Sequence, residues 1–231
     1  MNKDLSQLEG VIGVKFNNQD LLRQALVHRS YLNEHPNFPL PHNERLEFLG
    51  DAVLELIVTD YLYRNYDKPE GELTNWRASL VNAKMCAGVA REIDLEKFLY
   101  LSKGEQKDTN IKARNYILAN AIEALIGAIY LDQGYEAAKK FVHDRIISKL
   151  PYILENKLYL DPKTHFQELS QEKEGITPIY KVIDETGPDH NKTFKVGVYL
   201  NDKLVGTGEG SSKQEAQMAA AEEALKVYKQ K

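Results

Sequence analysis

The stretch NERLEFLGD at residues 43–51 decides the fold of this chain. It opens a largely apolar run that continues to Tyr63. The apolar positions of this run recur at steps of three and four residues, which is the spacing of one helix face. They are Leu46, Leu49, Val53, Leu56 and Ile57. The sequence therefore predicts one long helix here, with Asn43 as its N-cap.

The same helix carries acidic residues within its apolar run. Glu47 and Asp51 are four residues apart and Glu44 precedes Glu47 by three, so the three carboxylates lie along one face. Gly50 lies between them, although a glycine in a helix interior costs about 1 kcal/mol relative to alanine. It indicates that another group approaches the backbone closely at this point. Carboxylates in such a helix need a partner, either arginine or a metal ion.

A second apolar stretch, YILANAIEALIGAIYL at residues 116–131, has Asn120 and Glu123 as its only polar side chains besides the tyrosine hydroxyls. They are three residues apart, on one helix face. A helix this apolar is buried on most sides, so its two polar groups need a buried destination. If it crosses the first helix, they meet Glu47 and Asp51. Such a set of oxygen ligands suits Mg²⁺ or Mn²⁺.

The acidic residues of the two helices also have an alternative interpretation, in which their role is structural and they bind no metal. In that interpretation they cap helices or pair with arginines. The candidate partners are Arg45, Arg77 and Arg114. His28 is expected to be a packed or hydrogen-bonded histidine with no part in chemistry.

The stretch ERLEFLGDAVL at residues 44–54 strongly resembles the signature of ribonuclease III, the double-strand-specific endoribonuclease. The resemblance covers nearly the whole chain and continues in four further segments. They are LVHRSYLNE (26–34), PEGELTNWRASLVN (69–82), LSKGE (101–105) and ILANAIEALIGAIYLDQG (117–134). Carried over to this chain, the metal-binding and catalytic acids of the family fall on Glu47, Asp51 and Glu123. The fourth metal position, usually aspartate in the family, is Asn120.

The composition favours a soluble protein with one large or two small domains. The chain has 231 residues, 42% hydrophobic and 28% charged, and a formal net charge of −4. The single cysteine, Cys86, excludes an intrachain disulfide and is expected to be a small core residue. Residues 1–10 lack the apolar core of a signal peptide, and no run reaches the ~18 apolar residues of a membrane helix. We therefore expect a cytoplasmic protein without membrane contact.

The charge balance argues mildly against binding of nucleic acid, because proteins that bind nucleic acid usually have a basic surface. Neither the first 161 residues nor the remainder is basic overall. If RNA binds, the local placement of individual lysines and arginines must provide the contacts.

The first 155 residues are predicted to form an all-α domain. Further single helices are expected in three segments: 19–34, 75–93 and 135–154. Thr74 is the expected cap of the second of these helices, and residues 101–110 are expected to be an exposed loop. The resemblance places Glu70, in the PEG motif, near the RNA path or in a structural ion pair.

A homodimer is expected, because two helices apolar on most faces exceed what one small helical domain can bury. The resemblance implies the same assembly. In the family, a symmetric dimer forms one RNA-binding valley with a cleavage site from each subunit.

Residues 156–161 are the expected linker, and Asp161 followed by Pro162 predicts a helix start, as cap and first helical residue. From 162 to 231 the predicted order is α-β-β-β-α, a small α+β unit. It closely resembles the double-stranded-RNA-binding domain, which reads the shape of A-form RNA across two minor grooves. The expected fold is thus mainly α: an all-α ribonuclease III endonuclease domain at 1–155, followed by this domain at 162–231.

The resemblance to that domain implies three RNA-binding regions: one face of the first helix, a loop, and the start of the last helix. Their residues are Thr164, Gln167, Glu168 and Gln171; Pro188 and His190; and Ser212 and Lys213. Ser212 and Glu215 have the spacing of a capping box, and the helix N-terminus with Lys213 offers a phosphate site. The family usually has two or three lysines here; Gln214 and Gln217 take the other places.

The implied reaction is hydrolysis of duplex RNA to 5′-phosphate and 3′-hydroxyl ends with short 3′ overhangs. It needs Mg²⁺, with Mn²⁺ as a substitute, and no organic cofactor. Glu123 is assigned as the principal ligand, Asp51 as the group that positions or deprotonates the water, and Glu47 as the residue that completes the shell. The family suggests ribosomal-RNA precursors and structured messages as substrates.

Asn120 leaves two interpretations. In the first, the enzyme is active with three carboxylates, and the missing charge weakens metal binding. In the second, catalysis is attenuated and the protein serves as a duplex-RNA binder. A more distant alternative, a ribosome-associated structural relative, would be marked by loss of the acids, which are mostly present.

Overall fold

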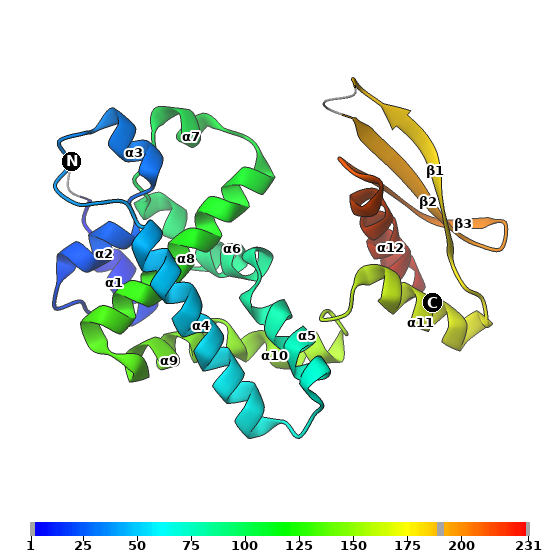
Figure 1. The fold of residues 1–231 in the computed structure, drawn as a ribbon, viewed down its shortest axis with the longest axis horizontal. Helices are drawn as coiled ribbons and strands as arrows, with labels where there is room; N and C mark the ends of the chain where they lie inside the picture. Colours follow the sequence, from blue (N-terminus) through cyan, green and yellow to red (C-terminus); the bar gives the residue numbers. More distant parts are fainter. Residues whose placement is uncertain (1–2, 189–191, 230–231) are drawn as a thin grey trace. The chain divides into compact units, whose positions relative to one another are not determined.

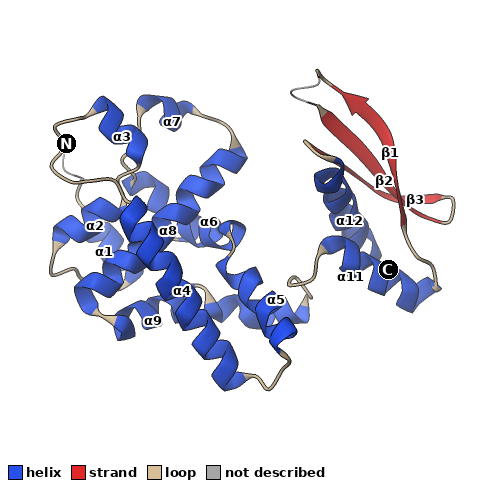
Figure 2. Cartoon of the chain, viewed as in Figure 1, coloured by secondary structure: helices blue, strands red, loops and turns tan. Residues whose placement is uncertain are grey.

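The structure, a computed structural model, describes residues 3–188 and 192–229. The chain divides into two compact units, Met1–Glu155 and Asn156–Lys231, called here the helical unit and the α+β unit (Figure 1). Helices make up the first unit, and the second combines helices with a three-stranded sheet (Figure 2). The predicted fold class is thereby confirmed.

The helical unit is built around two long helices. Its elements are α1 (Ser6–Ile12), α2 (Gln19–Ala25), α3 (Arg29–Glu34), α4 (Glu44–Asn65), α5 (Glu70–Val81), α6 (Ala83–Glu92), η1 (Leu95–Phe98), α7 (Lys103–Lys107), α8 (Ile111–Gln133), α9 (Tyr135–Arg145), η2 (Ile147–Lys149) and α10 (Leu150–Glu155). α8 is buried along most of its length, as its apolar sequence predicts, and packs against α2, α4, α6 and α9. α4 crosses it at the centre of the unit (Figure 1).

The predicted helix at 19–34 is in fact two helices. Val27 forms a parallel β-bridge with Tyr100, and the backbone N–H of His28 donates to the carbonyl of Tyr100 at 3.1 Å. Because Val27 and His28 pair with Tyr100, the backbone is extended here and the helix is interrupted, although the sequence pattern is helical. His28 caps α3 by accepting the N–H of Ser30 at its Nδ1, which is a structural role.

Asn43 lies at the N-cap position of α4, as predicted, but its side chain has a different role. Its side chain accepts no capping bond; it is buried, and its Nδ2 donates to the carbonyl of Ala25 at 3.2 Å. Its backbone N–H donates to the carbonyl of Val27 at 2.9 Å. Asn43 therefore ties the start of α4 to the end of α2.

Four further local predictions are corrected. α5 begins four residues before Thr74, whose hydroxyl donates to Glu70 at 2.9 Å instead of capping the helix. The segment 75–93 breaks at Asn82, whose side chain caps α6. The expected loop at 101–110 contains α7, because Ser102 accepts the N–H of Glu105 and caps a short helix. The segment 135–154 likewise divides into α9, η2 and α10.

The α+β unit packs two helices on one face of an antiparallel sheet. Its elements are α11 (Pro162–Glu174), β1 (Ile179–Thr186), β2 (Thr193–Leu200), β3 (Lys203–Gly210) and α12 (Lys213–Lys229), with strand order β1-β2-β3. Asp161 accepts the N–H groups of Lys163 and Thr164, so its cap role is confirmed. Phe166 and the inward side chains of β2 form the core with the alanines of α12.

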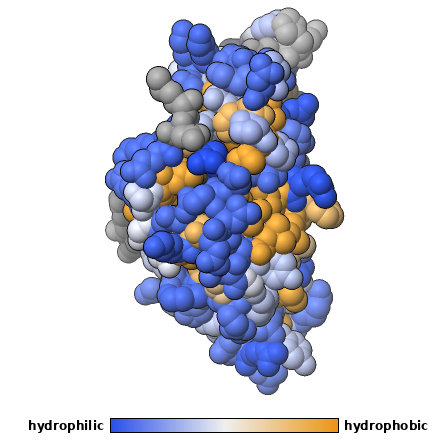
Figure 3. All heavy atoms as spheres, turned by 90° about the vertical axis from the view of Figure 1, so that its left-hand side faces the viewer, coloured by the Kyte–Doolittle hydropathy of each residue, from blue (hydrophilic) through white to orange (hydrophobic). Residues whose placement is uncertain are grey.

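Within the residues that the structure describes, no helix has both the length and the apolar character needed to cross a bilayer. The face turned to the viewer in Figure 3 shows hydrophobic patches between hydrophilic areas.

Candidate functional site

Glycines bring the backbones of α4 and α8 into direct contact. A Cβ built on Gly50 would lie 1.7 Å from the carbonyl oxygen of Glu123, and one built on Gly127 would lie 2.3 Å from the carbonyl oxygen of Leu46. No side chain fits at either position. The glycine in the apolar stretch at 43–51 is therefore explained by close backbone approach, as the sequence indicated.

The crossing brings the predicted acids within electrostatic reach of one another. Burial raises the pKa of Glu123 to about 7, with further contributions from the charges of Asp51 and Glu47. The pKa of Glu47 is also raised, mainly by burial and then by Glu44 and Asp51, while a hydrogen bond with Asn120 opposes that rise. The four side chains singled out in the sequence thus form one cluster on α4 and α8, called here the acid cluster: Glu47, Asp51, Asn120 and Glu123.

Cys86 is a neighbour of the acid cluster that sequence reasoning did not connect with it. The thiol is buried as expected, and burial raises its pKa to about 12, with smaller contributions from Glu123 and Asp51. It is therefore a neutral, apolar group beside the acids. No local signal marks this role, because α6 packs against α8 only through tertiary structure.

Two of the arginines considered as partners for the acids are engaged elsewhere. Arg77 donates to the hydroxyl of Thr59 at 3.1 Å. The Nε atom of Arg114 lies 3.4 Å from Glu96, and its Nη2 donates to the carbonyl of Glu105. Arg45 is exposed.

The donor set of the acid cluster fits a hard divalent cation. Three carboxylates and an amide oxygen are the ligands that Mg²⁺ and Mn²⁺ favour. Glu47 and Asp51 both raise the pKa of Glu123, and a cation would relieve that repulsion. Among the side chains that the structure describes, no group of three or more His, Cys, Asp or Glu is already drawn together in metal-binding geometry. The fit therefore rests on ligand chemistry and electrostatics.

Glu44, at the N-terminus of α4, belongs to the rim of the acid cluster. Its carboxylate lies 3.5 Å from Arg29 and 3.7 Å from the Nδ1 of His42. It is partly neutralised there and still contributes to the raised pKa of Glu47.

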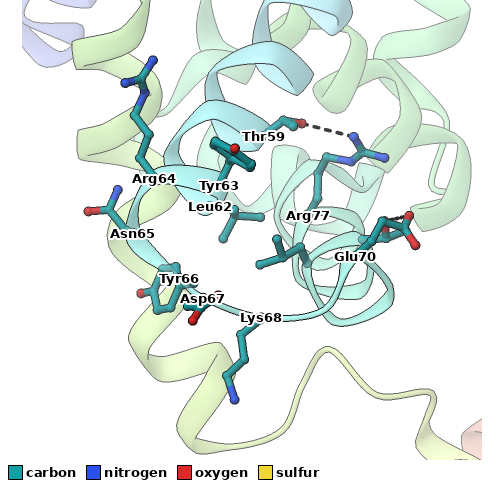
Figure 4. A pocket seen from close by; sticks show the side chains of 12 residues that line it. Thr59, Leu62, Tyr63, Arg64, Asn65, Tyr66, Asp67, Lys68, Glu70 and Arg77 are labelled. Carbon is teal, nitrogen blue, oxygen red and sulfur yellow. Dashed lines mark hydrogen bonds between the residues drawn. The ribbon is translucent and has the colours of Figure 1, made fainter.

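Glu70 lies at a separate cavity of about 920 Å³, formed where α4 ends and α5 begins (Figure 4). Tyr63 and Arg77 also line it. Glu70 is exposed and accepts the hydroxyl of Thr74. It is not among the groups that shift the pKa of Glu123, so it stands apart from the acid cluster.

The predicted RNA-binding face of α11 is available to a ligand. All four of its predicted residues are exposed: Thr164, Gln167, Glu168 and Gln171. Gln171 donates to the hydroxyl of Thr177 at 3.2 Å. In the loop after β1, Pro188 is exposed, and His190 lies outside the described residues.

The start of α12 forms a capping arrangement close to the predicted one. Ser212 accepts the N–H of Glu215 at 3.1 Å, as expected of a capping box. The return bond differs, because the Glu215 carboxylate accepts the N–H of Ser211. Lys213 is paired: its Nζ lies 3.2 Å from Glu185, a residue of β1 that sequence reasoning missed.

Comparison with known proteins covers both units. Residues 18–150 match a family model described as "Ribonuclease-III-like", and residues 162–228 match one described as "Double-stranded RNA binding motif". A protein named Ribonuclease 3 from Carboxydothermus hydrogenoformans is 48% identical over 98% of this chain and 97% of its own length. One of the same name from Enterococcus faecalis is 43% identical over 99% of both chains.

Solved structures match the helical unit. The nuclease domain of ribonuclease III from Campylobacter jejuni is 38% identical, with a TM-score of 0.56, over 65% of this chain and 98% of its own. A second structure of that domain, 37% identical with a TM-score of 0.54, covers 62% of this chain and 98% of its own. Its title reports structural flexibility in a region involved in dimer formation.

Proposed function

The chain belongs to the ribonuclease III family, and on this premise we propose that it cleaves double-stranded RNA with a divalent metal ion. Hydrolysis at the acid cluster leaves 5′-phosphate and 3′-hydroxyl ends. Precursors of ribosomal RNA and structured messages are the proposed substrates, in the cytoplasm. The observation that carries the proposal is the electrostatic coupling of Glu123 to Asp51 and Glu47 where the backbones of α4 and α8 touch.

The acid cluster provides the groups that this reaction needs. Glu123, Glu47 and Asp51 would hold Mg²⁺ or Mn²⁺, which activates water and neutralises charge on the leaving 3′-oxygen when bound. Asp51 is exposed, so its carboxylate can orient the attacking water and accept its proton. Asn120 interacts with Glu47 by a hydrogen bond and keeps that carboxylate in place. The contact between the backbones of α4 and α8 fixes where the side chains of the acid cluster lie along the two helices.

The α+β unit supplies duplex recognition. A double-stranded-RNA-binding domain spans two minor grooves and the phosphates between them, and reads shape instead of sequence. The exposed polar face of α11 suits contacts to 2′-hydroxyl groups. Lys213 at the start of α12 suits a phosphate.

A homodimer completes the proposed enzyme, with one cleavage site for each RNA strand. α4 carries large apolar side chains on its outer face: Phe48 is 81% exposed, Leu56 58% and Tyr63 80%. They recur at steps of eight and seven residues, so they share one helix face. An apolar stripe of this kind is typical of a subunit interface. We call it the α4 stripe.

The test is incubation of the full chain with a long RNA duplex in Mg²⁺ or Mn²⁺. We expect cleavage of duplex but not of single-stranded RNA, with 5′-phosphate ends on the products. Glu123→Gln should reduce the rate at least about 100-fold and leave duplex binding intact. Binding without cleavage in both metals would favour the second candidate, a duplex-RNA binder attenuated by Asn120.

A further inference from the structure

One carboxylate in the α+β unit lies between two lysines at the predicted phosphate site. The Oε1 atom of Glu185 is 3.2 Å from the Nζ of Lys213, and its Oε2 is 3.8 Å from the Nζ of Lys192. The register of the sheet brings them together: Glu185 of β1 lies opposite Phe194 of β2. The Lys213 ammonium lies 5.5 Å from the centre of the Phe194 ring. Lys213 is thus held over β2 and directed towards Glu185.

We propose that Glu185 is an intramolecular competitor of RNA at this site, occupying with its carboxylate the position that a backbone phosphate takes. The inference rests on the proposed function, since it assumes that Lys213 contacts phosphate. A lysine ammonium binds carboxylate and phosphate oxygens alike, as a point charge. A duplex phosphate must therefore displace Glu185 before it can pair with Lys213.

The exposure of the pair makes displacement feasible. The Lys213 and Glu185 side chains are 58% and 36% exposed. Ion pairs of this exposure are weak and screened by salt, so a phosphate can replace the carboxylate at low cost. Glu185 then lowers the affinity for duplex RNA by a modest factor, about two- to five-fold. The factor should shrink as salt weakens the internal pair.

The same sheet contains a second ion pair, which does not include Lys213. Lys195 of β2 lies 3.0 Å from Glu209 of β3. Glu209→Gln removes one negative charge from an exposed strand residue, as Glu185→Gln does. Any gain in RNA affinity from the less negative net charge alone should therefore appear in both variants.

The test measures duplex-RNA binding by the full chain in EDTA, so that no cleavage occurs, at low and moderate salt. Glu185→Gln should bind about two- to five-fold more tightly than Glu209→Gln at low salt, and by less at moderate salt. The gain should vanish in a Lys213→Ala background. Equal affinities of the two glutamine variants, or a gain that persists without Lys213, would overturn the proposal.

Failure of the premise has a different signature. If Lys213→Ala alone leaves duplex affinity unchanged, Lys213 is no phosphate contact and the Glu185 inference is overturned with it. Cleavage by the acid cluster is scored separately, with the unmodified chain in Mg²⁺. Loss of the Glu185 effect with retained cleavage would therefore leave the proposed enzyme standing.

Discussion

Gly50 of α4 lies against the backbone of Glu123 in α8, so close that a Cβ on the glycine would be 1.7 Å from the glutamate carbonyl oxygen. Gly50, which allows this contact, thus lies in the sequence between Glu47 and Asp51. These are two of the acids whose positions depend on the contact. Because backbone touches backbone, neither helix can slide without losing this fit. The geometry of the acid cluster depends on a residue with no side chain.

Gly50→Ala should therefore destabilise the helical unit strongly. The added methyl group meets backbone atoms that cannot turn away, so we expect a loss of about 3 kcal/mol, at the upper end for overpacking. The measurement is urea unfolding followed by circular dichroism. Gly88→Ala in α6 is the matched control, because its Cβ would meet nothing within 4 Å. It should stabilise by about 0.5–1 kcal/mol. Equal stability of the two variants would refute the backbone contact.

Glu123 should make the metal-free protein less stable as pH rises. Its folded-state pKa is about 7, above the ordinary value of 4.5, so the folded state holds the proton more tightly. Its contribution is fully present below pH ~4.5 and is lost as pH rises through ~7. In EDTA, Tm should fall over this range more steeply for the unmodified chain than for Glu123→Gln. Mg²⁺ should raise Tm more at pH 8 than at pH 5.5; parallel pH profiles of the two proteins would contradict the raised pKa.

Asn120→Asp tests what the amide does in the acid cluster. A fourth carboxylate should strengthen metal binding, so the Mg²⁺ concentration for half-maximal cleavage should fall several-fold. Without metal the same change removes the hydrogen bond that lowers the pKa of Glu47 and adds repulsion, so Tm in EDTA should fall. Metal titrations of cleavage and of Tm measure the two effects. If neither moves, position 120 limits neither metal binding nor stability.

Leu56→Lys should separate the proposed dimer. It places a charge in the α4 stripe, where Leu56 is 58% exposed in the single chain. Burying an unpaired ammonium in a subunit interface is costly, so we expect a shift to monomer at micromolar concentration by light scattering. Leu131→Lys, at a leucine of α8 that is 52% exposed and outside the stripe, is the control and should leave the mass unchanged. A monomeric unmodified chain would refute the dimer.

The acid cluster was predictable because its signals are local. The spacing within each helix and the glycine between Glu47 and Asp51 can be read without knowing the partner helix. The pairing of the two helices was predicted from the cost of burying polar groups without partners. This cost indicates which residues should meet, but it does not give the geometry of their side chains.

Glu185 was not predictable, because its position depends on an irregularity in β1. A register shift between Val182 and Asp184 places Glu185 opposite Phe194, where uninterrupted pairing would place it opposite Thr193. A bulge re-aims the side chains that follow it. Strand alternation in the sequence contains no sign of this shift. The break in the predicted helix at 19–34 has a similar origin, since Val27 is extended by pairing with Tyr100.

Asn43→Asp separates a helix cap from a tertiary anchor. Aspartate and asparagine serve about equally well as N-caps, so a cap would tolerate the change. In the structure, however, the Asn43 side chain is buried and donates to the carbonyl of Ala25. Aspartate has no such donor and would place a carboxylate against that carbonyl, so we expect a loss of about 1–3 kcal/mol in urea unfolding. Asn18→Asp is the matched control at an N-cap whose side chain does accept a backbone N–H, that of Asp20, and it should be nearly neutral. Because α4 begins at this anchor, Asn43→Asp should also slow duplex cleavage, whereas an unchanged stability would restore the cap interpretation.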